Sequence, residues 1–279
     1  MINLSLSDLL LCLITMPLTL MEVVCYSWPL GNYPVLCKLT GSLEAVSIFC
    51  STITIASIAV DRYLLIIKTV SNHPKSSPLW SAIVLFCIWL VSGALAYPLF
   101  FFRTLNRIIL SEDINIQFGI SSVDYCFEDW PAPYWSLGYS TCSSVLTFLI
   151  PVVVIILSHT SICARLSPRF RQNNRNNKTQ KLLIAIAATF ASCWLPLNLF
   201  NLVDYAGGLP LTYELKLILY ALCHLTGMSS ACLNPILYGW YNSTLRTELT
   251  IFFHRIVNCL GFPLSQSNNT NLTYSTTRF

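Results

Sequence analysis

Six long apolar segments run through the chain, and each is long enough to cross a lipid bilayer. A membrane-spanning helix needs about 20 predominantly apolar residues. The expected spans are Asn3–Tyr26, Leu36–Ile67, Leu79–Phe102, Tyr134–Ala164, Gln180–Tyr205 and Tyr213–Trp240. Prolines inside these segments are compatible with membrane helices, because neighbouring helices and bound water satisfy the backbone groups that proline frees. The sequence therefore predicts an all-α, multi-pass membrane protein.

The composition excludes most other classes of protein. Only 10% of the residues are charged, whereas a soluble domain has about 25%, so a soluble fold of this length could not cover its surface. Lys and Arg form no stripe interleaved with aromatic residues, so we expect no nucleic-acid partner. No nucleophile–base pair, metalloprotease motif or phosphate-binding loop is present, so we expect no enzymatic activity.

The distribution of basic residues predicts how the chain is oriented in the membrane. Short cytoplasmic loops carry the excess of Lys and Arg. All but four of the 16 Lys and Arg lie on one side of the expected spans. The four on the other side are Lys38, Arg103, Arg107 and Lys216. The basic side is therefore expected to be cytoplasmic, and acidic residues gather at the outer side, where they could attract a basic ligand.

A short amphipathic segment follows the last span. Ser243 to Val257 is too short and too charged to cross the bilayer, so we expect an interfacial helix with its apolar stripe in the lipid. Cys259, just beyond it, is a candidate for palmitoylation and hence for a contact with membrane lipid. Residues 1–257 form the expected transmembrane domain, and residues 258–279 form an expected disordered cytoplasmic tail.

Polar groups inside the expected spans indicate function, because burying them in a membrane is unfavourable. Asp8 is the only acidic residue deep in the first span, and Trp89 is central in the third. Three short motifs occupy other spans: Asp61-Arg62-Tyr63, Cys193-Trp194-Leu195-Pro196 and Asn234-Pro235-Ile236-Leu237-Tyr238.

These landmarks, taken in order, closely resemble helices two to seven of the rhodopsin-like (class A) G-protein-coupled receptors. Leu4-Ser5-Leu6-Ser7-Asp8 resembles helix two, Asp61-Arg62-Tyr63 helix three, Trp89 helix four and Pro151 helix five. Phe190 with the Trp194 motif resembles helix six, and the Asn234 motif resembles helix seven. The resemblance implies the seven-transmembrane receptor fold, represented here by six spans. Helix one and the outer N-terminal tail are absent from the resemblance, so we expect a truncated gene model or a fragment rather than a new topology.

The resemblance assigns a role to each motif. Arg62, beside Asp61, is expected to be held in an ion pair at rest and to meet a heterotrimeric G protein when released. Trp194 above Pro196 is expected to act as a switch on a kinked helix. The activation set implied by the family is Asp61, Arg62, Tyr63, Phe190, Trp194, Pro196, Asn234, Pro235 and Tyr238. The hydroxyl-rich tail is an expected arrestin platform after phosphorylation.

Two further sites follow from the resemblance. The family's disulfide between helix three and the second outer loop corresponds to Cys37 and Cys126, both on the oxidising side of the membrane. The family's interior sodium site corresponds to Asp8, Ser51, Ser230 and Asn234. Oxygen ligands around one carboxylate suit a small hard cation such as sodium. A hydrogen-bonded polar core without an ion remains an alternative, and no other cofactor is expected.

Within the family, the chain most resembles receptors of the neuropeptide Y and neuropeptide F type. Trp28-Pro29-Leu30-Gly31 in the first outer loop is typical of peptide receptors. The expected ligand-binding residues are Thr19, Glu22, Glu44, Asn198, Asp204, Tyr205 and His224. Two departures stand out: Glu44 replaces an expected glutamine, and Asp204 falls one residue earlier than the expected acid. Three outer acids, Glu22, Glu44 and Asp204, predict a peptide end that carries arginine.

Three other functions stay open at this stage. The chain could be a receptor for an amine or another small ligand, although amine receptors have Asp where this chain has Glu44. It could be a transporter, although no repeat relates its two halves. It could also be a truncated receptor that does not signal.

Overall fold

The computed structural model describes residues 2–25, 27–68, 78–109, 121–165, 174–208, 210–241, 246–247, 250–251 and 257. It divides into two units, Met1–Leu237 and Tyr238–Phe279. Within the described residues, six helices are long and apolar enough to cross a membrane. The prediction of a helical membrane protein with six spans is thereby confirmed, and the one sheet found in the described residues lies outside the spans.

The first and fourth spans are each built from three helical pieces. The first span consists of α1 (Ile2–Leu10), the π-helical turn η1 (Leu11–Thr15) and α2 (Met16–Cys25). The fourth consists of α6 (Pro133–Ser144), the π-helical turn η2 (Val145–Leu149) and α7 (Ile150–Arg165). The remaining spans are single helices: α3 (Pro34–Lys68), α4 (Pro78–Phe102), α9 (Asn174–Tyr205) and α10 (Tyr213–Tyr241).

Proline explains where the two π-helical turns occur. A proline ring clashes with the carbonyl of the residue four positions earlier. For Pro17 that residue is Leu13, inside η1, and for Pro151 it is Thr147, inside η2. A wider π turn makes room for the ring and keeps the span helical. Pro98, Pro196 and Pro235 lie inside α4, α9 and α10.

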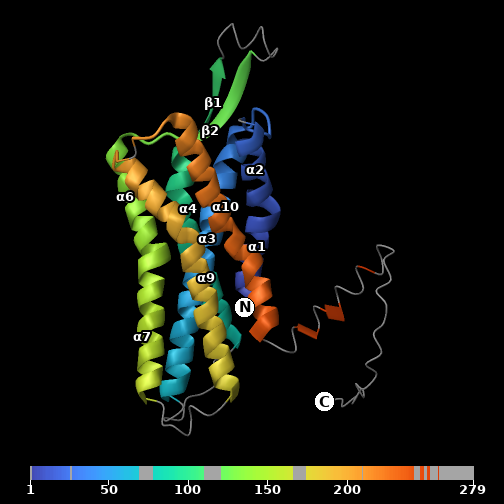
Figure 1. The fold of residues 1–279 in the computed structure, drawn as a ribbon, viewed down its shortest axis with the longest axis vertical. Coiled ribbons are helices and arrows are strands. Elements are labelled where there is room, and N and C mark those ends of the chain that lie inside the picture. Colours follow the sequence, from blue (N-terminus) through green and yellow to red (C-terminus); the bar gives the residue numbers. More distant parts are fainter. Residues whose placement is uncertain are drawn as a thin grey trace. The chain divides into compact units, whose positions relative to one another are not determined.

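Helix α3 lies at the centre of the first unit, where it packs against α1, α4, α7 and α9 (Figure 1). Polar side chains join three of these helices in the interior. The Asn3 amide of α1 donates to Thr54 Oγ1 of α3 at 2.7 Å. Its oxygen accepts from Trp89 Nε1 of α4 at 2.8 Å. Reciprocal hydrogen bonds of this kind satisfy polar side chains inside a membrane-spanning bundle.

A β-hairpin projects from the outer end of the first unit (Figure 1). Strand β1 (Arg103–Ile109) follows α4 directly and pairs antiparallel with β2 (Ser122–Glu128), with Arg103 opposite Glu128. The sequence analysis predicted only a long outer loop in this region. Strand pairing depends on hydrogen bonds between residues distant in the chain, which the apolar pattern of the spans does not reveal.

A disulfide between Cys37 of α3 and Cys126 of β2 ties this hairpin to the helices, as the family resemblance predicted. Trp28 is buried against both cysteines, and its backbone N–H donates to the Asp124 carbonyl at 2.7 Å. Gly31 has a φ of +70°, a conformation that glycine adopts at little cost, and so allows the turn after Trp28. The first outer loop and the hairpin therefore form one cap around the disulfide.

Several predictions concern residues beyond α10. Within the second unit, Thr250 Oγ1 donates to the Arg246 carbonyl at 2.8 Å, as in a helical turn. The expected apolar stripe of the interfacial helix, Cys259 and the tail lie outside the described residues. These expectations therefore stay predictions.

Removing the disulfide is expected to destabilise the protein. A bridge that closes a loop with a sequence separation of 89 contributes about 4 to 5 kcal/mol in the chain-entropy treatment. Cys37→Ala with Cys126→Ala should therefore lower the thermal unfolding midpoint in detergent and abolish its sensitivity to reductant. Cys87→Ala, at an exposed free cysteine, is the matched control. A double variant as stable as the control would contradict the prediction.

Candidate binding cavity

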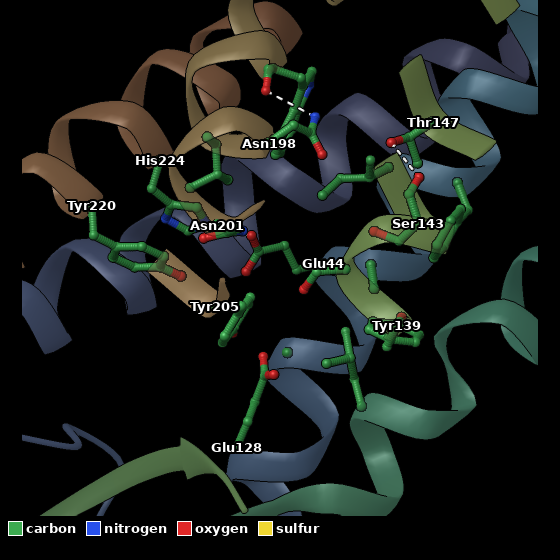
Figure 2. Close-up of a pocket in the computed structure, with 18 of the residues that line it drawn as sticks. Glu44, Glu128, Tyr139, Ser143, Thr147, Asn198, Asn201, Tyr205, Tyr220 and His224 are labelled. Carbon is green, nitrogen blue, oxygen red and sulfur yellow. Dashed lines mark hydrogen bonds and ion pairs between the residues drawn. The ribbon is translucent and has the colours of Figure 1, made fainter. Parts of the chain in front are cut away.

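An open cavity of about 140 Å³ lies beneath the hairpin at the outer end of the first unit (Figure 2). Its lining comes from α3, α4, β1, β2, α6, η2, α9 and α10. Among the residues expected to bind ligand, Glu44, Asn198, Tyr205 and His224 line this cavity together. Figure 2 shows Glu44, Asn201 and Tyr205 turned toward one space, with Glu128 of β2 near them.

A buried ion pair joins α3 to α10 in the wall of the cavity. His224 Nε2 lies 2.5 Å from Glu44 Oε1, and only 4% of the histidine side chain and 15% of the glutamate side chain are exposed. A carboxylate can only accept, so the imidazole N–H donates. Tyr220 stacks on the His224 ring with 5.4 Å between ring centroids. Glu44 therefore already has a partner within the protein.

The indole of Trp194 lines the cavity and is held on several sides. Its Nε1 donates to Ser230 Oγ of α10 at 3.1 Å, and Phe190 packs against it with ring centroids 6.0 Å apart. A Cβ at Gly227 would lie 2.9 Å from the indole, so glycine is needed there for close approach. The Asn198 amide donates to the Trp194 carbonyl at 2.9 Å. The expected switch is thus in direct contact with the candidate ligand space.

Other expected ligand residues lie apart from this lining. Asp204 accepts from Lys216 Nζ at 2.7 Å, and both side chains are about one third exposed. Neither Thr19 nor Asp204 is among the lining residues, and both are half-buried. Glu22, also half-buried, interacts electrostatically with Arg103 and Glu44. Two of the three outer acids, Glu44 and Asp204, are therefore ion-paired within the protein rather than unpaired.

Sequence reasoning missed Arg103 and Glu128 as lining residues of the cavity. Their positions held a weak signal, because Arg103 directly follows an apolar span and Glu128 lies two residues after Cys126. A second pair on the hairpin, Arg107 Nε and Asp124 Oδ1, is 2.8 Å apart. Its hydrogen bonds hold the pKa of the half-buried Asp124 carboxyl below its usual range.

A second polar cluster lies deeper in the bundle. Asp8 is buried, and Asn234 Nδ2 donates to its Oδ2 at 2.8 Å. Ser7 and Ser51 share a hydrogen bond at 2.7 Å. Among the described residues no Lys, Arg or His forms an ion pair with Asp8. The hydroxyl of Ser230, expected in the same sodium site, instead accepts from Trp194 Nε1. In the described ranges no group of three His, Cys, Asp or Glu could hold a metal, and the sodium site stays a prediction.

The cytoplasmic motifs are only partly described. Asp61 is exposed and Tyr63 half-buried in α3, while the side chains of Arg62 and Tyr238 lie outside the described residues. Pro196 is half-buried in α9, and Pro235 is exposed in α10. The expected resting ion pair of Arg62 therefore stays a prediction.

Comparison with known proteins gives one consistent result. Residues 1–238 match the family described as 7 transmembrane receptor (rhodopsin family). The chain is 38% identical over 264 residues to the neuropeptide F receptor of Drosophila melanogaster, covering 88% of this chain and 53% of that protein. It is 32% identical to neuropeptide Y receptor type 6 of Mus musculus, covering 90% of this chain and 70% of that receptor. The chain thus spans about half the length of the first relative and more of the second.

The Glu44–His224 pair generates a stability prediction. His224→Ala would leave Glu44 buried without its partner, and breaking a buried pair in this way costs about 3 to 5 kcal/mol. Glu44→Gln combined with His224→Ala removes the stranded charge and should recover most of the loss, as measured by thermal unfolding in detergent. Asp204→Asn, in the more exposed pair, should cost about 1 kcal/mol or less. Equal destabilisation by the single His224 variant and the double variant would contradict this prediction.

Proposed function

The chain belongs to the rhodopsin family of seven-transmembrane receptors, and from this premise we propose that it binds an extracellular neuropeptide and activates a heterotrimeric G protein. It is a multi-pass protein of the plasma membrane. The proposed role is signal transduction without a catalytic step. Relatives named as neuropeptide F and neuropeptide Y receptors support a peptide ligand.

The pairing of the Glu44 carboxylate with His224 is the observation that favours a peptide ligand over an amine. In amine receptors the acid at this position is expected to pair with the ligand's ammonium group. Here the acid at this position, Glu44, is already paired within the protein, with 2.5 Å between its Oε1 and His224 Nε2. An amine would have to displace a buried internal partner, whereas a peptide can use the rest of the polar lining.

The charge around the cavity supports a cationic peptide. Glu44 and Glu128 line the space, and Glu22 lies within electrostatic reach of Glu44. Arg103 and His224 are the basic residues of the described lining. The lining itself holds two acids and two bases, and Glu22 adds a third acid beside it. A ligand guanidinium presents five donors in a rigid fork and would balance that third negative charge.

The contacts of Trp194 suggest how binding reaches the cytoplasm. A ligand in the cavity would touch this indole, which is hydrogen-bonded to α10 through Ser230 and lies two residues before Pro196. A kinked helix bends at its proline, so a small rotation at Trp194 becomes a larger displacement at the cytoplasmic end of α9. Arg62 is proposed to meet the G protein there.

Further partners are proposed on sequence and position. A sodium ion would be held by Asp8, Ser51, Ser230 and Asn234, and when bound it would neutralise the buried carboxylate. Asn234 orients that carboxylate by donating to Oδ2. Arrestin is the proposed partner of the hydroxyl-rich tail after phosphorylation. Lipid attached at Cys259 is the proposed anchor of the segment after α10.

The test uses the full-length protein in membranes, with neuropeptide F as the probe. The wild type is expected to bind the peptide and to accelerate nucleotide exchange on a G protein. Arg62→Ala should reduce exchange to background while changing peptide affinity less than about threefold, within the scatter of surface substitutions. Lys181→Ala, at an exposed residue of α9 on the same cytoplasmic side, is the control.

Two results would count against the proposal. Binding of amines but not of peptides would identify a small-ligand receptor. Nucleotide exchange at the wild-type rate in Arg62→Ala would exclude the proposed coupling role of that residue.

A further inference from the structure

Arg103 carries a buried donor without a partner at the edge of the cavity. It is the first residue of β1 and lines the cavity beneath the hairpin. Its Nε atom is buried and has no hydrogen-bond partner. Leaving a buried donor unsatisfied costs about 1 to 3 kcal/mol, and more for a charged group. Trp28 Nε1 and Thr104 Oγ1 are the other buried side-chain atoms without a partner among the described residues, and neither residue lines the cavity. An unsatisfied buried group calls for an explanation, and for Arg103 its place in the cavity lining offers one.

Helix α3 makes room for this side chain at a single glycine. A Cβ added at Gly41 would overlap the Arg103 guanidinium and its Cδ. Glycine inside a helix is less favourable than alanine by about 1 kcal/mol. By contrast, a Cβ added at Gly93 of α4 would meet nothing within 4 Å. The missing side chain at Gly41 therefore leaves the space in which the Arg103 guanidinium lies beside the cavity.

The carboxylates near Arg103 do not form ion pairs with it. Glu128 lies opposite it in the hairpin register, yet Glu128 Oε2 accepts from Trp130 Nε1 at 2.8 Å. Glu44 is engaged by His224. The ion pairs found within the described part of the chain are Arg107–Asp124, Lys216–Asp204 and His224–Glu44. Arg107, on the same strand, has the carboxylate partner that Arg103 lacks.

We propose that Arg103 is a ligand-anchoring residue that donates to an uncharged oxygen of the peptide, a backbone carbonyl or a carboxamide. This inference rests on the proposed function, because it assumes a peptide ligand. A guanidinium nitrogen needs an acceptor, and a ligand oxygen would supply it. Electrostatic interactions connect Arg103 to Glu22 and Glu44, and Glu128 lines the same space.

The surrounding acids decide which acceptor fits. A ligand carboxylate placed against Arg103 would enter a site where these three glutamates repel it. A neutral carbonyl oxygen accepts the same hydrogen bond without that repulsion. The site is thus suited to a peptide that carries positive charge elsewhere and presents a carbonyl to Arg103.

Substitutions of Arg103 separate the two kinds of acceptor. In the full-length receptor, with neuropeptide F as the probe, Arg103→Met should weaken binding about ten- to a hundred-fold, the value of a hydrogen bond to a charged group. Arg103→Gln keeps an uncharged N–H donor and should retain more affinity than the Met variant. Arg107→Gln, on the same strand and already paired with Asp124, should bind as the wild type does.

The order of the variants is decisive. If Arg103→Gln binds as poorly as Arg103→Met while Arg103→Lys restores affinity, the acceptor is anionic and the inference is overturned. If the wild type binds and the Met variant matches it, the inference alone fails. If the wild type binds no peptide, the proposed function fails and the inference falls with it.

A second variant tests the space at Gly41 without altering Arg103. Gly41→Ala should displace the guanidinium and reproduce most of the affinity loss of Arg103→Met, and the two changes together should be no worse than either alone. Gly93→Ala, also in a membrane helix, should leave binding unchanged. Additive losses, or wild-type binding by Gly41→Ala, would show that Gly41 does not position Arg103 for the ligand.

Discussion

The absence of hydrogen-bond partners in lipid is the constraint on which the rest of this structure depends. Backbone groups at membrane depth must be satisfied within the segment, so every span is helical. Even the disruptions obey this rule, because η1 and η2 widen the helix around the carbonyl that each following proline would strike. Polar side chains are likewise paired across helices, as in the contacts of Asn3 with Thr54 and Trp89. The interior is thus held by few but reciprocal polar contacts.

The same constraint gives the outer cavity its character. Buried charged groups need partners, and Glu44 and His224 pair with one another in the cavity wall. Where solvent is accessible the requirement relaxes, so Lys216 and Asp204 pair in a more exposed setting. Arg103 departs from this pattern, since its buried Nε has no partner. Arg103 is the lining residue of the cavity with a buried, unsatisfied side-chain donor among the described residues, which is why we propose it as a ligand contact.

The cap over the cavity depends on a covalent tie. The disulfide joins the start of α3 to β2, and Trp28 packs on it from the first outer loop. In this arrangement Arg103 of β1 pairs directly with Glu128 of β2, where the hairpin leaves α4. The cap therefore contributes two charged side chains, Arg103 and Glu128, to the lining of the open cavity.

The sequence predicted the spans and the disulfide but not the hairpin or the ion-pair partners, and the reasons are physical. The spans, their order and the pairing of Cys37 with Cys126 followed from the apolar pattern and from motif resemblance, because bilayer thickness sets helix length. The hairpin did not follow, since its strands are defined by each other rather than by local pattern. The partners of Glu44 and Asp204 were also missed, and sequence reasoning treated both acids as available to a ligand.

The sequence by itself determined that the chain crosses a membrane as a series of helices, which side is basic, and which family its motifs resemble. These properties depend on local hydrophobicity, charge and residue order, and each can be read along one segment. Only the tertiary structure decided that His224 closes on Glu44 across 180 residues, and that Gly41 leaves room for Arg103. Such relations depend on distances between elements far apart in the chain, and no single segment encodes a distance to another.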